Sequence, residues 1–218
     1  MDDGATPGPA AHTPTGRRPR GEVRRALIDA GFALARAGGP GAVVLREATR
    51  HVGVAPNAVY RHFKDRDALL NAVCIEAMRD LARRMEDELA RVADPYGTTE
   101  GAIARLNAVG VAYLAFAASE PGLFEAAFSV PAHLRYATGA EAAGPGGRTP
   151  LQLLGDALDE LAVARVLPPD RRPDAEYAVW SAVHGMAVLV NQGPLRQLPS
   201  ATTRHVADLL LAFILRGL

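Results

Sequence analysis

The segment Leu45–Leu70, LREATRHVGVAPNAVYRHFKDRDALL, constrains the fold most, because its spacing predicts two short helices joined by a tight turn. Four residues recur at the spacing of one buried helical face: Leu45, Ala48, Thr49 and Val52. Gly53 tolerates the positive φ that a tight turn requires, and Pro56 can open the next helix because its missing N–H costs nothing there. This layout is that of a helix-turn-helix unit, whose second helix meets DNA with its first turn.

The second helix has one inward and one outward face. Val59 and Phe63 are four residues apart, so we expect both to pack against the first helix. The residues beside Pro56 then point outward, where they can reach base edges or phosphates. The predicted DNA-contacting residues of this segment are Arg46, Pro56, Asn57, Ala58, Tyr60, Arg61, His62 and Arg66. Base edges are assigned to Arg46, Asn57 and Arg61. Asp65 is expected to cap the helix that follows.

The run GVAPNAVYRHFKDRDALL resembles the signature of the TetR family of bacterial transcriptional regulators. It has a Gly-Val turn, an aliphatic–Tyr pair, a His-Phe pair and a basic–acidic pair before Leu, and the resemblance covers about residues 24–77. It implies that Tyr60, His62 and Arg66 contact the DNA backbone. Val44 and Ala55 depart from the pattern, because the family usually has a capping hydroxyl at each position. A missing cap costs about 1 kcal/mol, so we expect altered phosphate contacts and an unchanged fold.

The charge of the chain is unevenly distributed although its sum is zero. Residues 16–72 carry a net charge of +6, residues 73–218 carry −4 and residues 1–15 carry −2. A basic N-terminal module suits phosphate binding, although uneven surface charge would give the same split. Arg17, Arg18 and Arg20 either form an arm that reaches a flanking groove or phosphate, or remain a solvated charge run.

Little in the sequence favours an enzyme, a metal site or a membrane protein. The chain has no GxSxG, P-loop, HExxH or CxxC motif, and its single Cys74 is expected to be a small buried hydrophobic residue. Asp156, Asp159 and Glu160 have metal-compatible spacing, but we interpret them as a solvated acidic face. The start, MDDGATPGPAAHTPTG, is acidic and rich in proline, unlike a signal peptide, and no run of 18 apolar residues follows. We therefore predict a cytoplasmic protein without a cofactor or metal.

Residues 69–218 are predicted to form a helical body. Residues 65–92 read as one long connecting helix, and residues 175–191 and 201–216 as two last helices whose apolar coverage exceeds the need of one small core. The excess favours a partner surface, with a wholly intramolecular core as the alternative. The segment WSAVHGMAVL resembles the Trp and His-Gly pattern of one TetR branch, and the family dimerises through its last two long helices. The predicted dimer residues are Val179, Val183, Met186, Val190, Leu209 and Phe213.

A ligand pocket is expected among the helices within residues 99–128, 151–166 and 175–191, since ligand sites have mostly apolar walls with few polar groups. The expected lining residues are Tyr113, Phe116, Phe124, Phe128, Trp180 and His184, although His184 is also compatible with a core position.

The sequence thus predicts an all-α protein with a disordered tail (1–16), a three-helix helix-turn-helix domain (17–68) and a helical ligand-binding and dimerisation domain (69–218). The predicted function is a homodimeric regulator that binds a partly palindromic double-stranded DNA operator and is released by a small-molecule effector. The alternative is a helical small-molecule-binding protein or enzyme without a DNA function. Activation of transcription in place of repression leaves no trace in the sequence.

Overall fold

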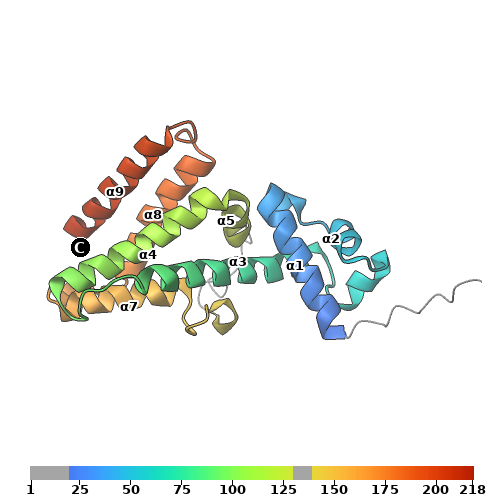
Figure 1. Ribbon diagram of the computed structural model, residues 1–218, viewed down its shortest axis with the longest axis horizontal. Coiled ribbons are helices and arrows are strands. Elements are labelled where there is room, and N and C mark those ends of the chain that lie inside the picture. Colours follow the sequence, from blue (N-terminus) through green and yellow to red (C-terminus); the bar gives the residue numbers. More distant parts are fainter. Residues whose placement is uncertain (1–19, 130–138) are drawn as a thin grey trace, which may run out of the picture.

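The computed structural model describes residues 20–129 and 139–218, and these residues form helices and no strands (Figure 1). The helices of the N-terminal head are α1 (Arg20–Gly38), η1 (Pro40–Ala42), α2 (Leu45–Val52) and η2 (Pro56–Arg61), where η denotes a 3₁₀-helix. Those of the body are α4 (Thr99–Ser119), α5 (Pro121–Phe128), η3 (Ala140–Ala142), α7 (Pro150–Val163), η4 (Pro169–Arg171), α8 (Ala175–Asn191) and α9 (Ser200–Gly217). The long helix α3 (Arg66–Leu89) joins the two parts. The all-α prediction is confirmed.

The head folds around the residues that the helical spacing placed inside. Ala48 and Thr49 of α2 are buried, as are Val59 of η2 and Phe63, which lies two residues after the end of η2. Gly53 ends α2 with a φ of 73°, the left-handed conformation that the turn requires. The second helix is a tighter 3₁₀-helix, because the Ala58 and His62 amides bond to carbonyls three residues back.

Helix α3 begins as predicted and belongs to both parts of the molecule. The Ala68 amide donates to the Asp65 carboxylate at 2.8 Å, which caps the helix start. Leu69 and Val73 are buried beside α1, whereas Leu81 and Met85, two to three turns later, are buried in the body. The domain boundary expected between residues 68 and 69 therefore falls inside a continuous helix of about 36 Å.

Helix α4 is the central helix of the body. It contacts α3, α5, α7, α8 and α9, and its length and apolar composition would allow it to cross a membrane. Half of its most apolar stretch is buried inside the protein. Phe116 and Ala117 are among the buried residues. This packing makes α4 the core helix of the body.

One expectation about acidic residues is wrong. Glu160 does not belong to a solvated face, because only 1% of the residue is exposed and its carboxylate accepts from the Gly97 amide at 2.9 Å and from Arg105 at 2.8 Å. Asp156 and Asp159 pair at the surface with Arg148 and Arg172. Glu160 thus ties α7 to the start of α4, and the described residues contain no cluster that could hold a metal ion.

Candidate DNA-binding surface and internal cavity

The outward face of η2 presents several of the side chains predicted to contact DNA. Pro56, Asn57 and Arg61 are exposed, and Tyr60 is 60% exposed. Ala58 and His62 are half-buried beside them. Val59 and Phe63 anchor the opposite face, so the backbone fixes which side chains point outward. The result is an exposed, mainly polar surface on a short helix.

Two arginines on this surface are not used within the protein. Arg46 on α2 and Arg61 on η2 are exposed, and no described residue forms an ion pair or a hydrogen bond with the guanidinium group of either. Arg50, by contrast, pairs with Glu47 at 2.8 Å. The unpaired guanidinium groups can therefore bind phosphates or the acceptor edge of guanine.

Arg66 has a structural role that the sequence interpretation missed. Its Nε donates to the Val43 carbonyl at 2.9 Å, and its guanidinium also donates to the Pro40 carbonyl. These bonds tie the start of α3 to the segment before α2. These bonds use only part of the donor capacity of the guanidinium, so the phosphate contact from Arg66 stays a prediction. Nothing local in the sequence signals this long-range partnership.

The two departures from the usual capping pattern leave their helices uncapped. Val44 precedes α2 and Ala55 precedes η2, and neither makes a side-chain capping bond. Arg17 and Arg18 lie outside the described residues, and Arg20 is described only as the first residue of α1.

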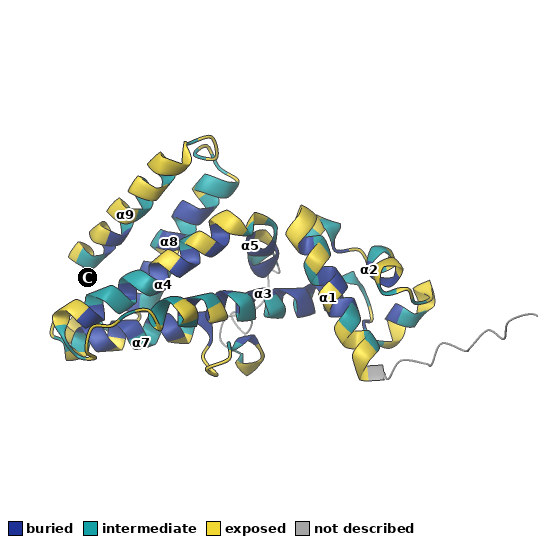
Figure 2. Cartoon of the chain, viewed as in Figure 1, coloured by how far each residue is buried: buried dark blue, intermediate teal, exposed yellow. Residues whose placement is uncertain are grey.

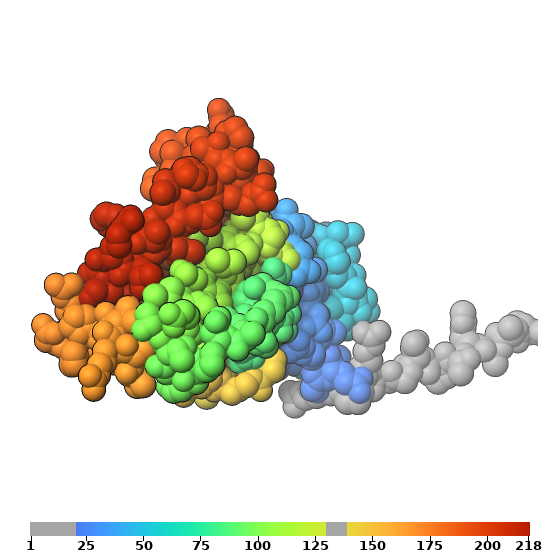
Figure 3. All heavy atoms as spheres, turned by 60° about the vertical axis from the view of Figure 1, so that its left-hand side comes forward, coloured from blue at the N-terminus to red at the C-terminus, as the bar shows by residue number. Residues whose placement is uncertain are grey.

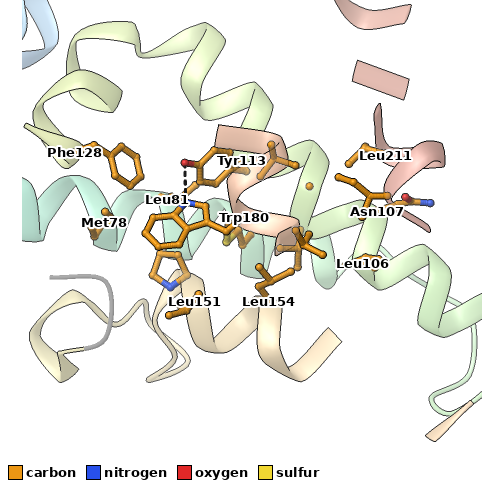
Figure 4. Close-up of a pocket in the computed structure, with 17 residues that line it drawn as sticks. Met78, Leu81, Leu106, Asn107, Tyr113, Phe128, Leu151, Leu154, Trp180 and Leu211 are labelled. Atoms are coloured by element: carbon orange, nitrogen blue, oxygen red, sulfur yellow. Dashed lines mark hydrogen bonds between the residues drawn. The ribbon is translucent and has the colours of Figure 1, made fainter. Parts of the chain in front are cut away.

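A second feature is an apolar cavity inside the body, about 40 Å³ in volume (Figure 4). Helix α3 contributes Met78, Leu81 and Met85, and helix α4 contributes the wall from Leu106 to Tyr113. Leu211 and Ile214 of α9 also line the cavity. Helices α7 and α8 provide further apolar side chains, Leu154 and Val183 among them.

The polar groups at the middle of this wall bond to one another. The indole N–H of Trp180 donates to the Tyr113 hydroxyl at 3.2 Å, and that hydroxyl lies 2.8 Å from Nδ1 of His184. Burial raises the pKa of Tyr113 and lowers the pKa of His184, so both groups are neutral near pH 7. The Tyr113 hydroxyl and Nδ1 of His184 thus share one hydrogen bond, and the tautomer of the neutral imidazole sets which of the two donates.

Comparison with known proteins assigns both the head and the body to one family. Residues 27–73 match the family model described as bacterial regulatory proteins of the tetR family, and residues 106–214 match the tetracyclin repressor-like C-terminal domain. The chain belongs to the TetR family. It is a TetR-type DNA-binding transcriptional regulator with an N-terminal helix-turn-helix domain and a C-terminal TetR domain, as the sequence predicted. Members of this family are generally not enzymes.

Solved structures share the fold of this TetR-family chain at low sequence identity. A protein of unknown function from Rhodococcus sp. RHA1 is 23% identical with a TM-score of 0.71, and the match covers 95% of this chain and 99% of that one. A tetR-family transcriptional regulator from Streptomyces coelicolor is 21% identical with a TM-score of 0.56, covering 89% and 79%. A putative TetR-family regulator from Rhodococcus sp. is 21% identical with a TM-score of 0.58, covering 89% and 99%. No curated protein matches the chain.

The expected pocket residues of this regulator divide into two groups. Tyr113, Phe128 and Trp180 line the cavity. Phe116 and Phe124 do not, because both are buried in the core; Arg84 covers the Phe116 ring at 5.3 Å, and Phe124 packs edge-on against Tyr113 at 5.9 Å. His184 is not among the lining residues, but it is hydrogen-bonded to the hydroxyl of Tyr113. The α3 and α9 residues on the wall, and Asn107, were not anticipated.

The expected dimer face also needs correction. Val179, Val183 and Met186 are buried within the protomer, and the first two line the cavity. Val190 is half-buried. The outward apolar residues of the last two helices are Tyr177, Leu189, Leu209 and Phe213. Helix α9 is exposed along most of its length and lies on the outside of the molecule (Figures 2 and 3). The unpartnered apolar face is therefore the side of α8 and α9 opposite the cavity.

The head contacts the body where α5 meets the end of α1. Glu120, at the corner between α4 and α5, accepts from Arg36 of α1 at 2.8 Å and from Arg84 of α3 at 3.1 Å. A Cβ atom added to Gly122 would lie 2.3 Å from the Ala35 carbonyl oxygen. The backbones of α5 and α1 thus touch directly, and α5 also carries Phe128, which lines the cavity.

Proposed function

We propose that this regulator is a homodimeric repressor that a small-molecule effector releases from its operator. The observation that carries the proposal is the placement of α9. One face of this helix lines the internal cavity through Leu211 and Ile214, and its opposite face exposes Leu209 and Phe213. A ligand that displaces α9 from inside the cavity would therefore also move the surface where a second copy is expected to bind.

The proposed partner of the head is a partly palindromic double-stranded operator. Asn57, Arg46 and Arg61 read base edges, and Tyr60 and His62 hold phosphates on either side. A two-fold dimer requires two half-sites related by dyad symmetry and about one helical turn or more apart. Such a regulator works in the cytoplasm, where bacterial DNA lies.

The proposed dimer forms through the outward face of α8 and α9. Phe213 is 69% exposed and Leu209 is 52% exposed, which is unusual for large apolar side chains on one helical face. Ala178, Ala182 and Gly185 of α8 are small and at least partly exposed beside them. This composition suits close packing of two helix pairs around a two-fold axis.

The small volume of the cavity supports a mechanism of release. About 40 Å³ accommodates about three water molecules, so an effector must push its walls apart. Helix α9 makes few buried contacts, with Leu211 and Ile214 as its buried residues, and is the wall that moves most easily. Binding then favours a dimer whose heads no longer match the half-sites. A tenfold loss of operator affinity needs a difference of about 1.4 kcal/mol between the two states.

Selection of bound fragments from genomic DNA with the purified chain tests the DNA function and supplies the operator. Asn57→Ala should relax preference at one base pair by about 1–3 kcal/mol, whereas Tyr60→Phe should weaken all sequences alike. Binding should fall steeply with salt. Failure to enrich any dyad-symmetric site would favour the alternative, a helical small-molecule binder without a DNA function. A reporter placed behind the selected operator distinguishes repression from activation.

A further inference from the structure

The wall of the cavity carries no charged side chain. The residues that line it are apolar except for Asn107, Tyr113 and the indole N–H of Trp180. A charged ligand would lose its hydration there without meeting a countercharge, which is strongly unfavourable. A neutral, mainly apolar ligand meets no such barrier.

Asn107 is the polar group of this wall whose hydrogen-bonding capacity is unused by the described residues. The Tyr113 hydroxyl and the Trp180 N–H are already bonded to each other, and the hydroxyl is also bonded to His184. No hydrogen bond joins the side-chain amide of the half-buried Asn107 to another described residue, and this amide offers two donors and one acceptor oxygen. A ligand group that both donates and accepts would match it.

The position of Asn107 at one end of the cavity indicates how a ligand would be oriented. The lining residues of α3 run from Met78 to Met85 and those of α4 from Leu106 to Tyr113, a span of about 10 Å along each helix. Figure 4 places Phe128 and Met78 toward one end of this span and Asn107 toward the other. A polar head at Asn107 would thus leave an apolar tail lying along α3.

We infer that the effector is an uncharged, elongated, mainly apolar molecule with one terminal hydroxyl or carboxamide group, which Asn107 recognises. This inference rests on the proposed role of the cavity as the effector site. It makes Asn107 the residue that selects the polar end, and Met78, Leu81 and Phe128 the surface for the apolar remainder.

The chain contains a natural probe for the test, since Trp180 is its single tryptophan and lies on the cavity wall. The fluorescence of the full-length protein is titrated at pH 7.5 with four molecules of matched skeleton: octanamide, 1-octanol, octanoate and octylammonium. A thermal shift with each molecule gives a second readout. The two neutral molecules should bind at least tenfold more tightly than either ion.

Two substitutions at the half-buried Asn107 locate the recognition. Asn107→Leu should weaken octanamide at least tenfold, whereas 1-octene, added here as a ligand of similar length without a polar head, should change by less than threefold. Asn107→Asp should shift the preference toward octylammonium. Gln197→Leu removes an amide from an exposed loop and should change nothing.

The outcomes separate the ligand class from the effector site. Tighter binding of octanoate or octylammonium by the unmodified chain, with a Trp180 response, would refute the neutral class while keeping the cavity as a ligand site. Unchanged octanamide binding in both Asn107 variants would refute the role of Asn107. No Trp180 response and no thermal shift with any of the four molecules would overturn this inference and the proposed effector site together.

Discussion

Gly122→Ala probes how tightly the head is fixed to the body. The added Cβ would lie 2.3 Å from the Ala35 carbonyl oxygen, whereas ordinary contacts begin near 3.4 Å, so the end of α1 must withdraw by about 1 Å. The opposing groups are backbone atoms, and Ala35 also accepts from the Gly39 amide at 2.8 Å, so rotation of a side chain cannot relieve the overlap. Overpacking of this kind costs about 1–3 kcal/mol, partly offset by the better helix propensity of alanine.

The expected result is a lower urea midpoint and at least a tenfold loss of operator affinity, because both heads of the dimer shift relative to the half-sites. Gly155→Ala is the matched control, since its added Cβ would meet only Arg172, at 3.7 Å. Urea titration gives the stability, and fluorescence anisotropy with labelled operator gives the affinity. Unchanged affinity in a destabilised Gly122→Ala variant would show that this contact does not orient the head, and an unchanged midpoint would show that the contact is not tight.

Three further predictions follow from the body. Phe213→Asp should give a monomer by sedimentation at micromolar concentration, whereas Val163→Asp, a change at a similarly exposed position of α7, should leave the dimer intact. A dimeric Phe213→Asp variant would contradict the proposed interface. Burial lowers the pKa of His184 in the folded protein below its usual 6.5. As the pH falls below about 6.5, His184 is therefore protonated in the unfolded chain before it is protonated in the folded protein, and the free energy of unfolding decreases. His184→Gln should reduce the fall in melting temperature between pH 7.5 and 5, and an identical fall would refute this account. Arg105→Met leaves the buried Glu160 carboxylate without its cation and should lower the free energy of unfolding, measured in urea, by about 3 kcal/mol. The double variant Arg105→Met/Glu160→Leu should recover most of this stability.

The head could be predicted closely because its local signals agree with one another. The Gly53 turn, the Asp65 cap and the buried Val59 and Phe63 each depend on residues within a few positions in the sequence. The structural role of Arg66 could not be predicted, because its partners, the carbonyls of Pro40 and Val43, lie more than twenty residues away and have no side-chain signature.

The body was less predictable because its helices are apolar on several faces. Nearly every position of α8 could be buried, so periodicity did not reveal that Val179 and Val183 point into the cavity while Leu189 points outward. The burial of Glu160 could not be predicted from the sequence either. It depends on Arg105 and on the Gly97 amide, which only the packed fold brings close to its carboxylate.

The burial of Cys74 makes distances between the two heads accessible to spectroscopy. Its thiol is fully buried, donates to the Ala126 carbonyl, and has its pKa raised by burial to about 12, so it reacts poorly with maleimides or methanethiosulfonates. It is also the single cysteine of the chain. A cysteine introduced at the exposed Lys64 would therefore carry one label per protomer without removal of the native thiol. Pulsed electron paramagnetic resonance or single-molecule energy transfer could then measure the head-to-head spacing of an otherwise unmodified dimer, with and without a candidate effector.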